Sequence, residues 1–200
     1  MMDDSYTYED YLSDFALDYL GFPKEAVPDS PSEESTGKEP AQEADACGNP
    51  VNKRAAIRIM TGKDYEGVYK LWMSCKGMGL NNLDDSKEGI EKFLCRNPKT
   101  CFVAEEDGEI VGAILAGNDG RRGYIYHTAV HPDSRNQGIG SALAEAAMEA
   151  LEALDINKVA LVVFSKNQDG NAFWEKLGFT VRDDLVYRNK TITEMIRIDT

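Results

Sequence analysis

A loop with two glycines joins a strand-like run to a helix-like run in the C-terminal half of the chain. The run from Tyr124 to Pro132 is rich in β-branched and aromatic residues, which is typical of a β-strand. Residues 141–151 are mostly strong helix formers. Between the two runs, residues 135–140 read Arg-Asn-Gln-Gly-Ile-Gly. This order predicts an anion-binding site, because unpaired backbone N–H groups and the positive end of a helix dipole point toward the ligand.

Two familiar phosphate-binding loops do not fit this segment. The chain contains no G-x-x-x-x-G-K-[ST] sequence, which excludes a P-loop nucleotide-binding protein. Position 143 is leucine, where the dinucleotide-binding fingerprint has its third glycine. Gly138 and Gly140 have no Cβ atoms, so a phosphate could still approach the backbone closely.

The loop resembles the R/Q-x-x-G-x-G/A segment of the GCN5-related N-acetyltransferase (GNAT) superfamily, which binds the pyrophosphate of acetyl-coenzyme A. Residues 129–132, Ala-Val-His-Pro, are similar to the family's strand-to-loop junction. Residues 167–179 resemble the family's N-x-x-A-x-x-x-Y-x-x-x-G-F helix, and residues 57–65 its opening strand and first helix cap. The resemblance covers residues 55–200.

The resemblance implies an α/β (α+β) fold, with a mixed and mostly antiparallel twisted sheet flanked by helices. Hydrophobic patterning predicts matching elements, with a turn at Asp107-Gly108. The expected strands are 55–60, 100–106, 109–117, 122–130, 158–164, 179–188 and 192–198, and the expected helices are 62–75, 84–95, 138–153 and 168–177.

The acidity of the chain belongs to its first quarter. The net charge is −13, and residues 1–50 hold 13 acidic and two basic side chains, while residues 51–200 hold 22 and 20. No cluster of Lys and Arg offers a nucleic-acid footprint, no apolar run has membrane-spanning length, and the N-terminus has no secretory signal pattern. The four cysteines form no C-x-x-C pair and are interpreted as reduced thiols. We therefore expect a cytoplasmic protein with no nucleic-acid or membrane partner and no metal.

Three segments are expected along the chain. Residues 51–200 form the GNAT domain, and residues 23–50, rich in Pro, Glu, Ser and Gly, form a flexible linker. Residues 1–22 interleave aromatic and acidic side chains, with a helical spacing of apolar positions. This pattern fits a short helix docked on the chain's own domain or on a homodimer mate, and it also fits disorder. A recognition helix for a separate partner and a lid over the substrate groove are further alternatives.

The resemblance assigns the acetyl-CoA contacts by position. Backbone groups of Thr128, Ala129 and Val130 are expected to pair with the pantetheine arm. The guanidinium of Arg135 suits a phosphate oxygen, and Asn167 suits a pantetheine amide. The pyrophosphate is expected on the N–H groups of Asn136, Gln137, Gly138, Ile139, Gly140 and Ser141.

The chain departs from the family at a tyrosine that often protonates the leaving thiolate. Trp174 stands at that position, and its indole N–H can hydrogen-bond the co-substrate but cannot serve as an acid. Gly170 also replaces the usual alanine. Tyr187, on an expected neighbouring strand, is a substitute acid. Because CoA thiolate has an ordinary thiol pKa, transfer could also proceed more slowly without an acid.

Two further tyrosines occupy the strand before the loop, where some family members place a glutamate or histidines as base. Strict alternation puts Tyr124, Tyr126 and Thr128 on one face and His127 on the other. Tyr124 and Tyr126 are therefore expected to line the acceptor groove, with a water relay favoured over a tyrosine base. His127 is expected to point into the other layer, and His131 lies in the loop.

The expected acceptor site lies between the 76–83 loop, the next helix and the last strand pair, near Trp72, Met78, Leu80, Asp84 and Asp85. We therefore predict an acetyl-CoA-dependent N-acetyltransferase that acts by direct transfer in a ternary complex. The acceptor would be a primary amine, on a protein N-terminus or a small molecule. The alternative is a CoA-binding regulatory or interaction protein with weak or no turnover, whose N-terminal segment recruits a partner.

Overall fold

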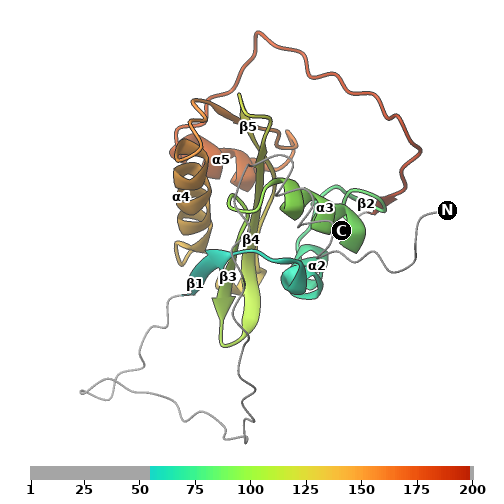
Figure 1. The fold of residues 1–200 in the computed structure, drawn as a ribbon. Coiled ribbons are helices and arrows are strands. Elements are labelled where there is room, and N and C mark those ends of the chain that lie inside the picture. The colour runs from blue at the N-terminus through green and yellow to red at the C-terminus, as the bar shows by residue number, and fades with distance from the viewer. Residues whose placement is uncertain (1–54, 199–200) are drawn as a thin grey trace, which may run out of the picture. The chain divides into compact units, whose positions relative to one another are not determined.

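The computed structural model describes residues 55–198, which form a sheet with helices on both faces (Figure 1). The two expected N-terminal segments, 1–22 and 23–50, lie outside the described residues. The expectations for them stay predictions.

The main sheet has five strands in the order β1-β3-β4-β5-β6. The strands β1 to β5 pair in antiparallel fashion and β6 pairs with β5 in parallel, so the predicted mixed and mostly antiparallel sheet is confirmed. A separate two-residue pairing joins β2 (Leu80–Asn81) to β7 (Arg197–Ile198). The bounds of the main strands are β1 Ala56–Ile59, β3 Phe102–Glu106, β4 Glu109–Asn118, β5 Gly123–Val130 and β6 Val159–Leu161.

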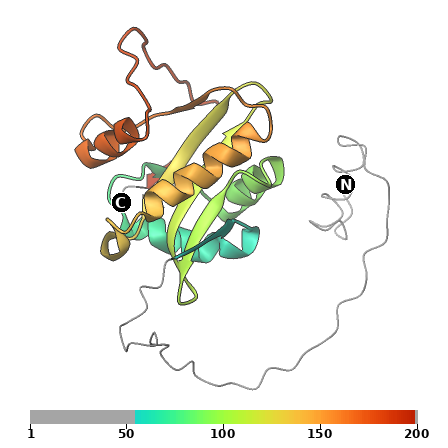
Figure 2. The same cartoon turned by 90° about the vertical axis from the view of Figure 1, so that its left-hand side faces the viewer.

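The helices form two layers, one on each face of the sheet (Figures 1 and 2). One layer holds α2 (Tyr65–Ser74) and α3 (Lys87–Arg96), and the other holds α4 (Ile139–Glu152) and α5 (Gln168–Lys176). Short 3-10 turns, η1 (Gly62–Asp64) and η2 (Pro132–Ser134), precede α2 and α4.

Two hydrophobic cores fix these layers. The α2 face of the sheet packs on the apolar stripe of α2, in which Val68, Leu71 and Trp72 are fully or almost fully buried. The α4 face packs on Leu143, Ala147 and Leu151 of α4. This helical spacing is the one that the sequence predicts, because residues three and four apart share one helix face.

The helix predicted at 84–95 begins later, at Lys87. The side-chain oxygen of Asn81 accepts hydrogen bonds from the N–H groups of Leu83 and Asp84, at 2.9 and 2.8 Å, and closes a turn there. Ser86 then caps the helix, because its hydroxyl accepts from the N–H of Gly89 at 3.1 Å.

The last two predicted strands are wrong except for Arg197–Ile198. Residues 179–196 form no strand, and Val181 and Leu185 are 86% and 60% exposed. Strand β6 ends at Leu161 and does not reach residue 164, so the segment has no long neighbour on which to build a ladder. Tyr187 therefore lies in a loop, not on a strand.

Candidate active site

The loop between β5 and α4 presents a row of free backbone donors. Asn136 and Gly138 have positive φ angles of 62° and 84°, which turn the chain sharply before α4. Gly138 is the N-cap residue and has no side chain with which to cap the helix. Within residues 55–198, the N–H groups of residues 136–141 donate to no other group. These donors lie at the positive end of a fourteen-residue helix, which favours a bound anion.

The two glycines of the loop serve different purposes. A Cβ on Gly138 would meet no atom within 4 Å, so its positive φ is what requires glycine. A Cβ on Gly140 would lie 3.3 Å from the ring of Phe173, so its absence allows α5 to approach the start of α4.

Arg135 braces the end of the strand that leads into this loop. Its Nε donates to the carbonyl oxygen of Val130 at 3.1 Å, and the Sγ of Cys75 approaches the same oxygen at 3.6 Å. The expected contact of Arg135 with a phosphate stays a prediction.

The second half of β5 has a free edge next to the loop. Pairing with β6 ends at Ile125, while pairing with β4 continues to Val130. The N–H of His131 donates to the carbonyl of Val111 at 2.8 Å, and alternation along an antiparallel ladder then directs the backbone groups of Ala129 toward β4. The backbone groups of Thr128 and the N–H of Val130 face the free edge, while the carbonyl of Val130 already accepts from Arg135. Thr128 and the N–H of Val130, and not Ala129, therefore fit the expected pairing with pantetheine.

A β-bulge breaks the alternation that the sequence suggests. Two residues of β5, Tyr126 and His127, lie opposite the single residue Leu115 of β4. Both side chains therefore project toward α2 and α3. Thr128 is paired with Ile114 of the α4 core, and its Oγ1 is buried without a hydrogen-bond partner in the described part of the chain. The prediction that Thr128 shares the face of Tyr126, and that His127 points into the other layer, is wrong for this reason.

The tyrosines form an aromatic cluster on the α3 side of the bulge. The ring of Tyr126 lies 4.8 Å from that of Tyr124 and 5.2 Å from that of Phe93. Burial, and then the neighbouring Tyr187 and Tyr126, raise the pKa of Tyr124 above its usual range. Tyr124 is therefore a neutral phenol that can donate a hydrogen bond, and a poor proton acceptor.

His127 meets a buried carboxylate on the other side of the bulge. Its Nε2 lies 2.7 Å from Oδ1 of Asp85, which is 4% exposed. The other carboxylate oxygen accepts from the backbone N–H of Asn81 at 2.7 Å and from its Nδ2 at 3.2 Å. The ring of Trp72 lies 5.2 Å from the imidazole. The sequence places Asp85 near the acceptor but gives no sign of this pair, because its members are 42 residues apart.

The motif on α5 is held together by its own cap. The side-chain oxygen of Asn167 accepts from the N–H of Gly170 at 3.0 Å, which leaves its amide donor for a ligand. Trp174 is 8% exposed and packs edge-to-face between Phe173 and Phe179, at 4.9 and 5.1 Å. In this structure the tryptophan is a core residue, and its expected contact with the co-substrate stays a prediction.

The N–H groups of residues 136–141, called here the cradle, lie in the same part of the chain as the free edge of β5 and the α5 motif. This part of the chain matches known proteins. Residues 65–179 match the family model of the acetyltransferase (GNAT) family. The chain belongs to the GNAT family. A relative named acetyltransferase SG1711, from Sodalis glossinidius (strain morsitans), is 36% identical over 138 residues, which are 69% of this chain and 96% of the relative.

Solved structures confirm the GNAT fold. A ribosomal-protein-alanine N-acetyltransferase from Brucella melitensis biovar Abortus 2308 aligns with a TM-score of 0.53 and 23% identity, over 68% of this chain and 99% of that one. The PaiA N-acetyltransferase from Thermoplasma acidophilum, solved with coenzyme A, aligns with a TM-score of 0.59 and 19% identity, over 72% and 98%. The family match and the acetyltransferase relative show that this GNAT protein is an N-acetyltransferase.

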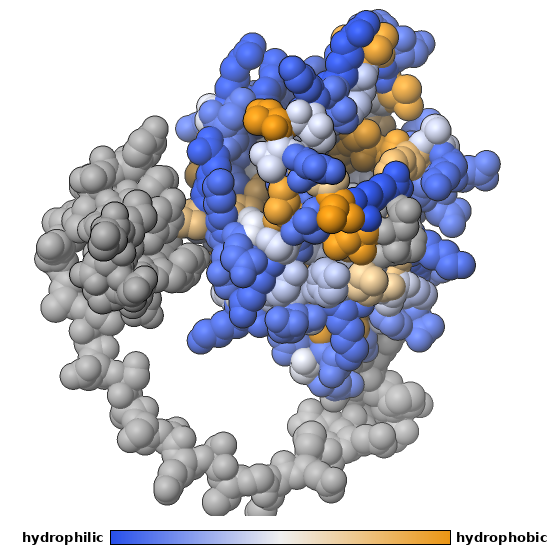
Figure 3. All heavy atoms as spheres, turned by 90° about the vertical axis from the view of Figure 1, so that its right-hand side faces the viewer, coloured by the Kyte–Doolittle hydropathy of each residue, from blue (hydrophilic) through white to orange (hydrophobic). Residues whose placement is uncertain are grey.

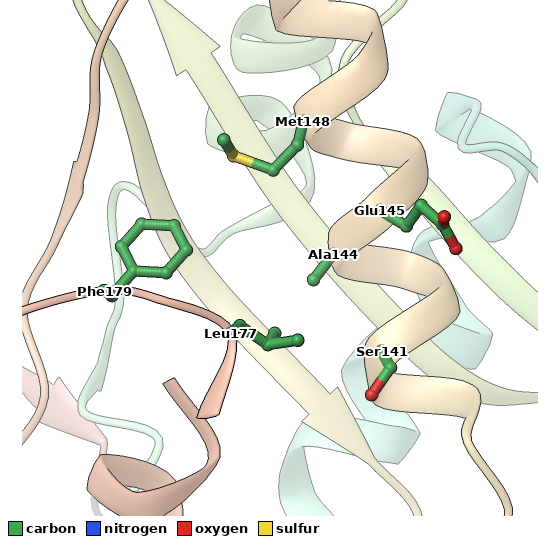
Figure 4. A pocket seen from close by; sticks show the side chains of 6 residues that line it. All are labelled: Ser141, Ala144, Glu145, Met148, Leu177 and Phe179. Carbon is green, nitrogen blue, oxygen red and sulfur yellow. The ribbon is translucent and has the colours of Figure 1, made fainter. Parts of the chain in front are cut away.

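Two hollows lie beside these elements of the GNAT domain. One, of about 340 Å³, lies between α4 and the chain after α5; Figure 4 shows the side chains of Met148, Leu177 and Phe179 around it, with Glu145 at its border. The other, of about 600 Å³, lies on the α3 face, where Figure 3 shows apolar side chains exposed among polar ones. The lining of this second hollow, called here the α3 hollow, is Phe93, Arg96, Asn97, Gly117, Asn118, Asp119, Arg122, Gly123, Tyr124, Tyr126, Lys158 and Ala160.

The described part of the GNAT domain offers neither a metal cluster nor a membrane-spanning helix. Among residues 55–198, no three His, Cys, Asp or Glu side chains gather closely enough to hold a metal ion. Each helix in the same range is too short or too polar to span a bilayer.

Proposed function

We propose that this GNAT protein moves the acetyl group of acetyl-CoA directly to a primary amine, within a ternary complex of enzyme, acetyl-CoA and acceptor. The amine belongs to a protein N-terminus or to a small molecule. The proposal depends most on one observation: the unpaired N–H groups of residues 136–141 adjoin the unpaired edge of β5.

This arrangement fits the chemistry of acetyl-CoA. The row of N–H groups at the start of α4 suits a pyrophosphate, and the free edge of β5 suits an extended chain with amide groups. Thr128 supplies backbone groups at that edge, and Val130 supplies its N–H. Arg135 is proposed to turn a guanidinium N–H toward a phosphate, and Asn167 to donate its amide to pantetheine.

The thioester is expected near the bulge, because β5 and β6 separate just before it. Ile125 and Leu161 are the last paired residues, and Tyr126 is the first residue beyond them. We propose that Tyr124 or Tyr126 donates a hydrogen bond to the reacting groups, and that Tyr187 reaches the leaving thiolate. The raised pKa of Tyr124 supports a donor role, since a neutral phenol keeps its proton.

The described cysteines support direct transfer over an acetyl-enzyme intermediate. Burial raises the pKa of the Cys101 thiol to about 12, and its residue is 1% exposed. Burial also raises the pKa of Cys95, and thiols whose pKa is raised by burial are poor nucleophiles. The Sγ of Cys75, the third described cysteine, approaches the carbonyl of Val130. All three are free, which supports the cytoplasmic location predicted from the sequence.

The α3 hollow is the proposed acceptor site, because it includes Tyr124 and Tyr126 next to the point where the strands separate. Arg96, Arg122 and Lys158 line it, against one carboxylate, that of Asp119. That carboxylate accepts the backbone N–H of Arg122 at 2.7 Å. The excess of positive charge favours an acceptor that carries an anionic group beside its amine, and it disfavours polycationic amines.

The burial of Trp174 favours one alternative. An acetyl-CoA-binding regulator with weak turnover would not need a proton donor at this position, and the N-terminal segment could then recruit a partner. Changing Trp174 to Tyr separates the two functions. A large gain in rate would favour the regulator, and an unchanged or lower rate would favour the enzyme.

The test of the proposed function is a calorimetric titration of the full chain with acetyl-CoA. One-to-one binding is expected, and Gly138→Val is expected to abolish it, because valine cannot adopt a φ of 84° without distorting the cradle. The matched control is Gly108→Val, which replaces a glycine with a φ of 81° in the β3–β4 turn and should leave binding intact. Binding that survives Gly138→Val would refute the cradle, and no binding by the native chain would refute the function.

A further inference from the structure

The bulge brings a histidine, a buried carboxylate and a tryptophan together next to Tyr126, which lines the α3 hollow. We infer that His127 is the general base for the acceptor amine and that Asp85 is its positioning residue. This inference rests on the proposed function and adds the group that accepts the proton.

The contact with Asp85 suggests which ring nitrogen is free. A carboxylate only accepts, so we assign the tautomer in which Nε2 of His127 donates to Asp85 at 2.7 Å. The lone pair then belongs to Nδ1, which makes no hydrogen bond to any of residues 55–198. Nδ1 is bonded to the ring carbon nearest the backbone, whereas Nε2, at the far end of the ring, faces Asp85.

A carboxylate and an aromatic ring contact the imidazole. The carboxylate of Asp85 contacts Asn81 through two hydrogen bonds and His127 through a third. These contacts hold it in place beside the imidazole. The ring of Trp72 is 5.2 Å from the imidazole, within the range in which an aromatic ring attracts a cation. Burying a carboxylate to 4% exposure is costly, and a pair of this kind contributes little to stability.

The step balances with the acetyl group that acetyl-CoA supplies. The ammonium form of the acceptor gives one proton to Nδ1 of His127, and the freed lone pair attacks the thioester carbon. The C–N bond forms, the C–S bond breaks, and the nitrogen loses its second proton to the leaving thiolate. The products are the acetamide, CoA thiol and one proton, which the imidazolium returns to water.

The experiment compares two amines that differ in basicity and little in size. Ethylamine is protonated at neutral pH and needs a base, whereas 2,2,2-trifluoroethylamine is mostly the free base, because its fluorines withdraw electrons. The variant is His127→Gln, whose terminal amide keeps a donor for Asp85 but cannot accept a proton. Release of CoA thiol at saturating acetyl-CoA gives kcat for each amine. Calorimetry with acetyl-CoA checks that each variant still folds and binds.

We expect His127→Gln to lower kcat for ethylamine about 100-fold, the scale of general base catalysis, and to lower it less than about threefold for trifluoroethylamine. Asp85→Asn should show the same selectivity with a smaller loss. The control His131→Gln, which changes the other histidine, should behave like the native chain.

The outcomes separate the two proposals. Equal losses with both amines, or none, would overturn the role of His127 while the native chain still turns over. If the native chain fails to bind acetyl-CoA, or releases no thiol above the uncatalysed rate with either amine or with 4-aminobutanoate, the proposed function fails and the role of His127 fails with it.

Discussion

Restoring the family's alanine at position 170 should leave the stability of the fold almost unchanged, for two reasons that cancel. A Cβ on Gly170 would lie 2.5 Å from the side-chain nitrogen of Asn167, so Asn167 must swing away and lose its 3.0 Å cap bond. The loss of an N-cap costs about 1 kcal/mol. Replacing glycine by alanine inside a helix gains about 1 kcal/mol.

The cancellation can be tested with a double-mutant cycle. Asn167→Ala alone should lower the free energy of unfolding by about 1 kcal/mol, but it should cost almost nothing once Gly170→Ala is present, because the cap is already lost. The expected coupling is therefore about 1 kcal/mol. Urea unfolding followed by tryptophan fluorescence measures it, since Trp174 is buried on the same helix. Equal costs of Asn167→Ala in both backgrounds would refute the reasoning.

A second glycine offers a matched comparison. Gly89 stands three residues after the cap residue Ser86, as Gly170 does after Asn167, but its Cβ would collide with the backbone carbonyl of Leu83. A backbone atom cannot swing aside, so Gly89→Ala should lower the free energy of unfolding by about 1–3 kcal/mol. If Gly89→Ala and Gly170→Ala prove equally harmless, the added Cβ atoms do not have the effects described.

Three further predictions concern the acceptor, a thiol and acid stability. At saturating acetyl-CoA, 4-aminobutanoate should be a better acceptor than 1,4-diaminobutane, and changing Arg96 and Arg122 to glutamate should reverse the order; an unaltered order would refute the role of the hollow's charge. Cys101, whose burial raises its pKa to about 12, should react with a thiol reagent only after denaturation, which mass spectrometry of the labelled chain can check. Burial raises the pKa of Asp64, but hydrogen bonds from Arg58 and Thr61 outweigh it and lower the pKa overall, so its stabilising contribution is present above about pH 4 and is lost as the pH falls through the lowered pKa. Asp64→Asn should therefore destabilise the fold more at pH 7 than at pH 3, and equal urea midpoint shifts at both values would contradict this sign.

Local chemistry made much of the fold predictable. The helix after the loop was expected at 138–153 and spans Ile139–Glu152, because the glycines and the run of helix formers lie next to each other in the sequence. The loop's donors followed from the same neighbourhood, and the structure shows Asn136 and Gly138 turning the chain as the anion site requires. Asn167 was expected at a helix start and is the N-cap of α5.

Long-range geometry set the limits of prediction. Tyr124, Ile125 and Tyr126 alternate regularly in the sequence. Only their pairing with β4 shows that β5 has one extra residue at this point, which forms the bulge. The partnership of Asp85 and His127 depends on that shift, so no local pattern encodes it. The apolar positions of residues 179–188 resemble a strand, but a strand needs a neighbour, and β6 is only three residues long.

The bulge also bears on how such a site can arise. Ala116 with Ile125 and Ile114 with Thr128 remain in register on either side of it, so the residues beyond the bulge keep the faces that they would have in a regular strand one residue shorter. Removing Tyr126 would leave His127 alone opposite Leu115 and the rest of the sheet unaltered. Three nucleotides of coding sequence are thus enough to add or withdraw an aromatic wall beside the histidine. A change in length at this point would thus alter what lies beside His127 and leave the rest of the sheet in register.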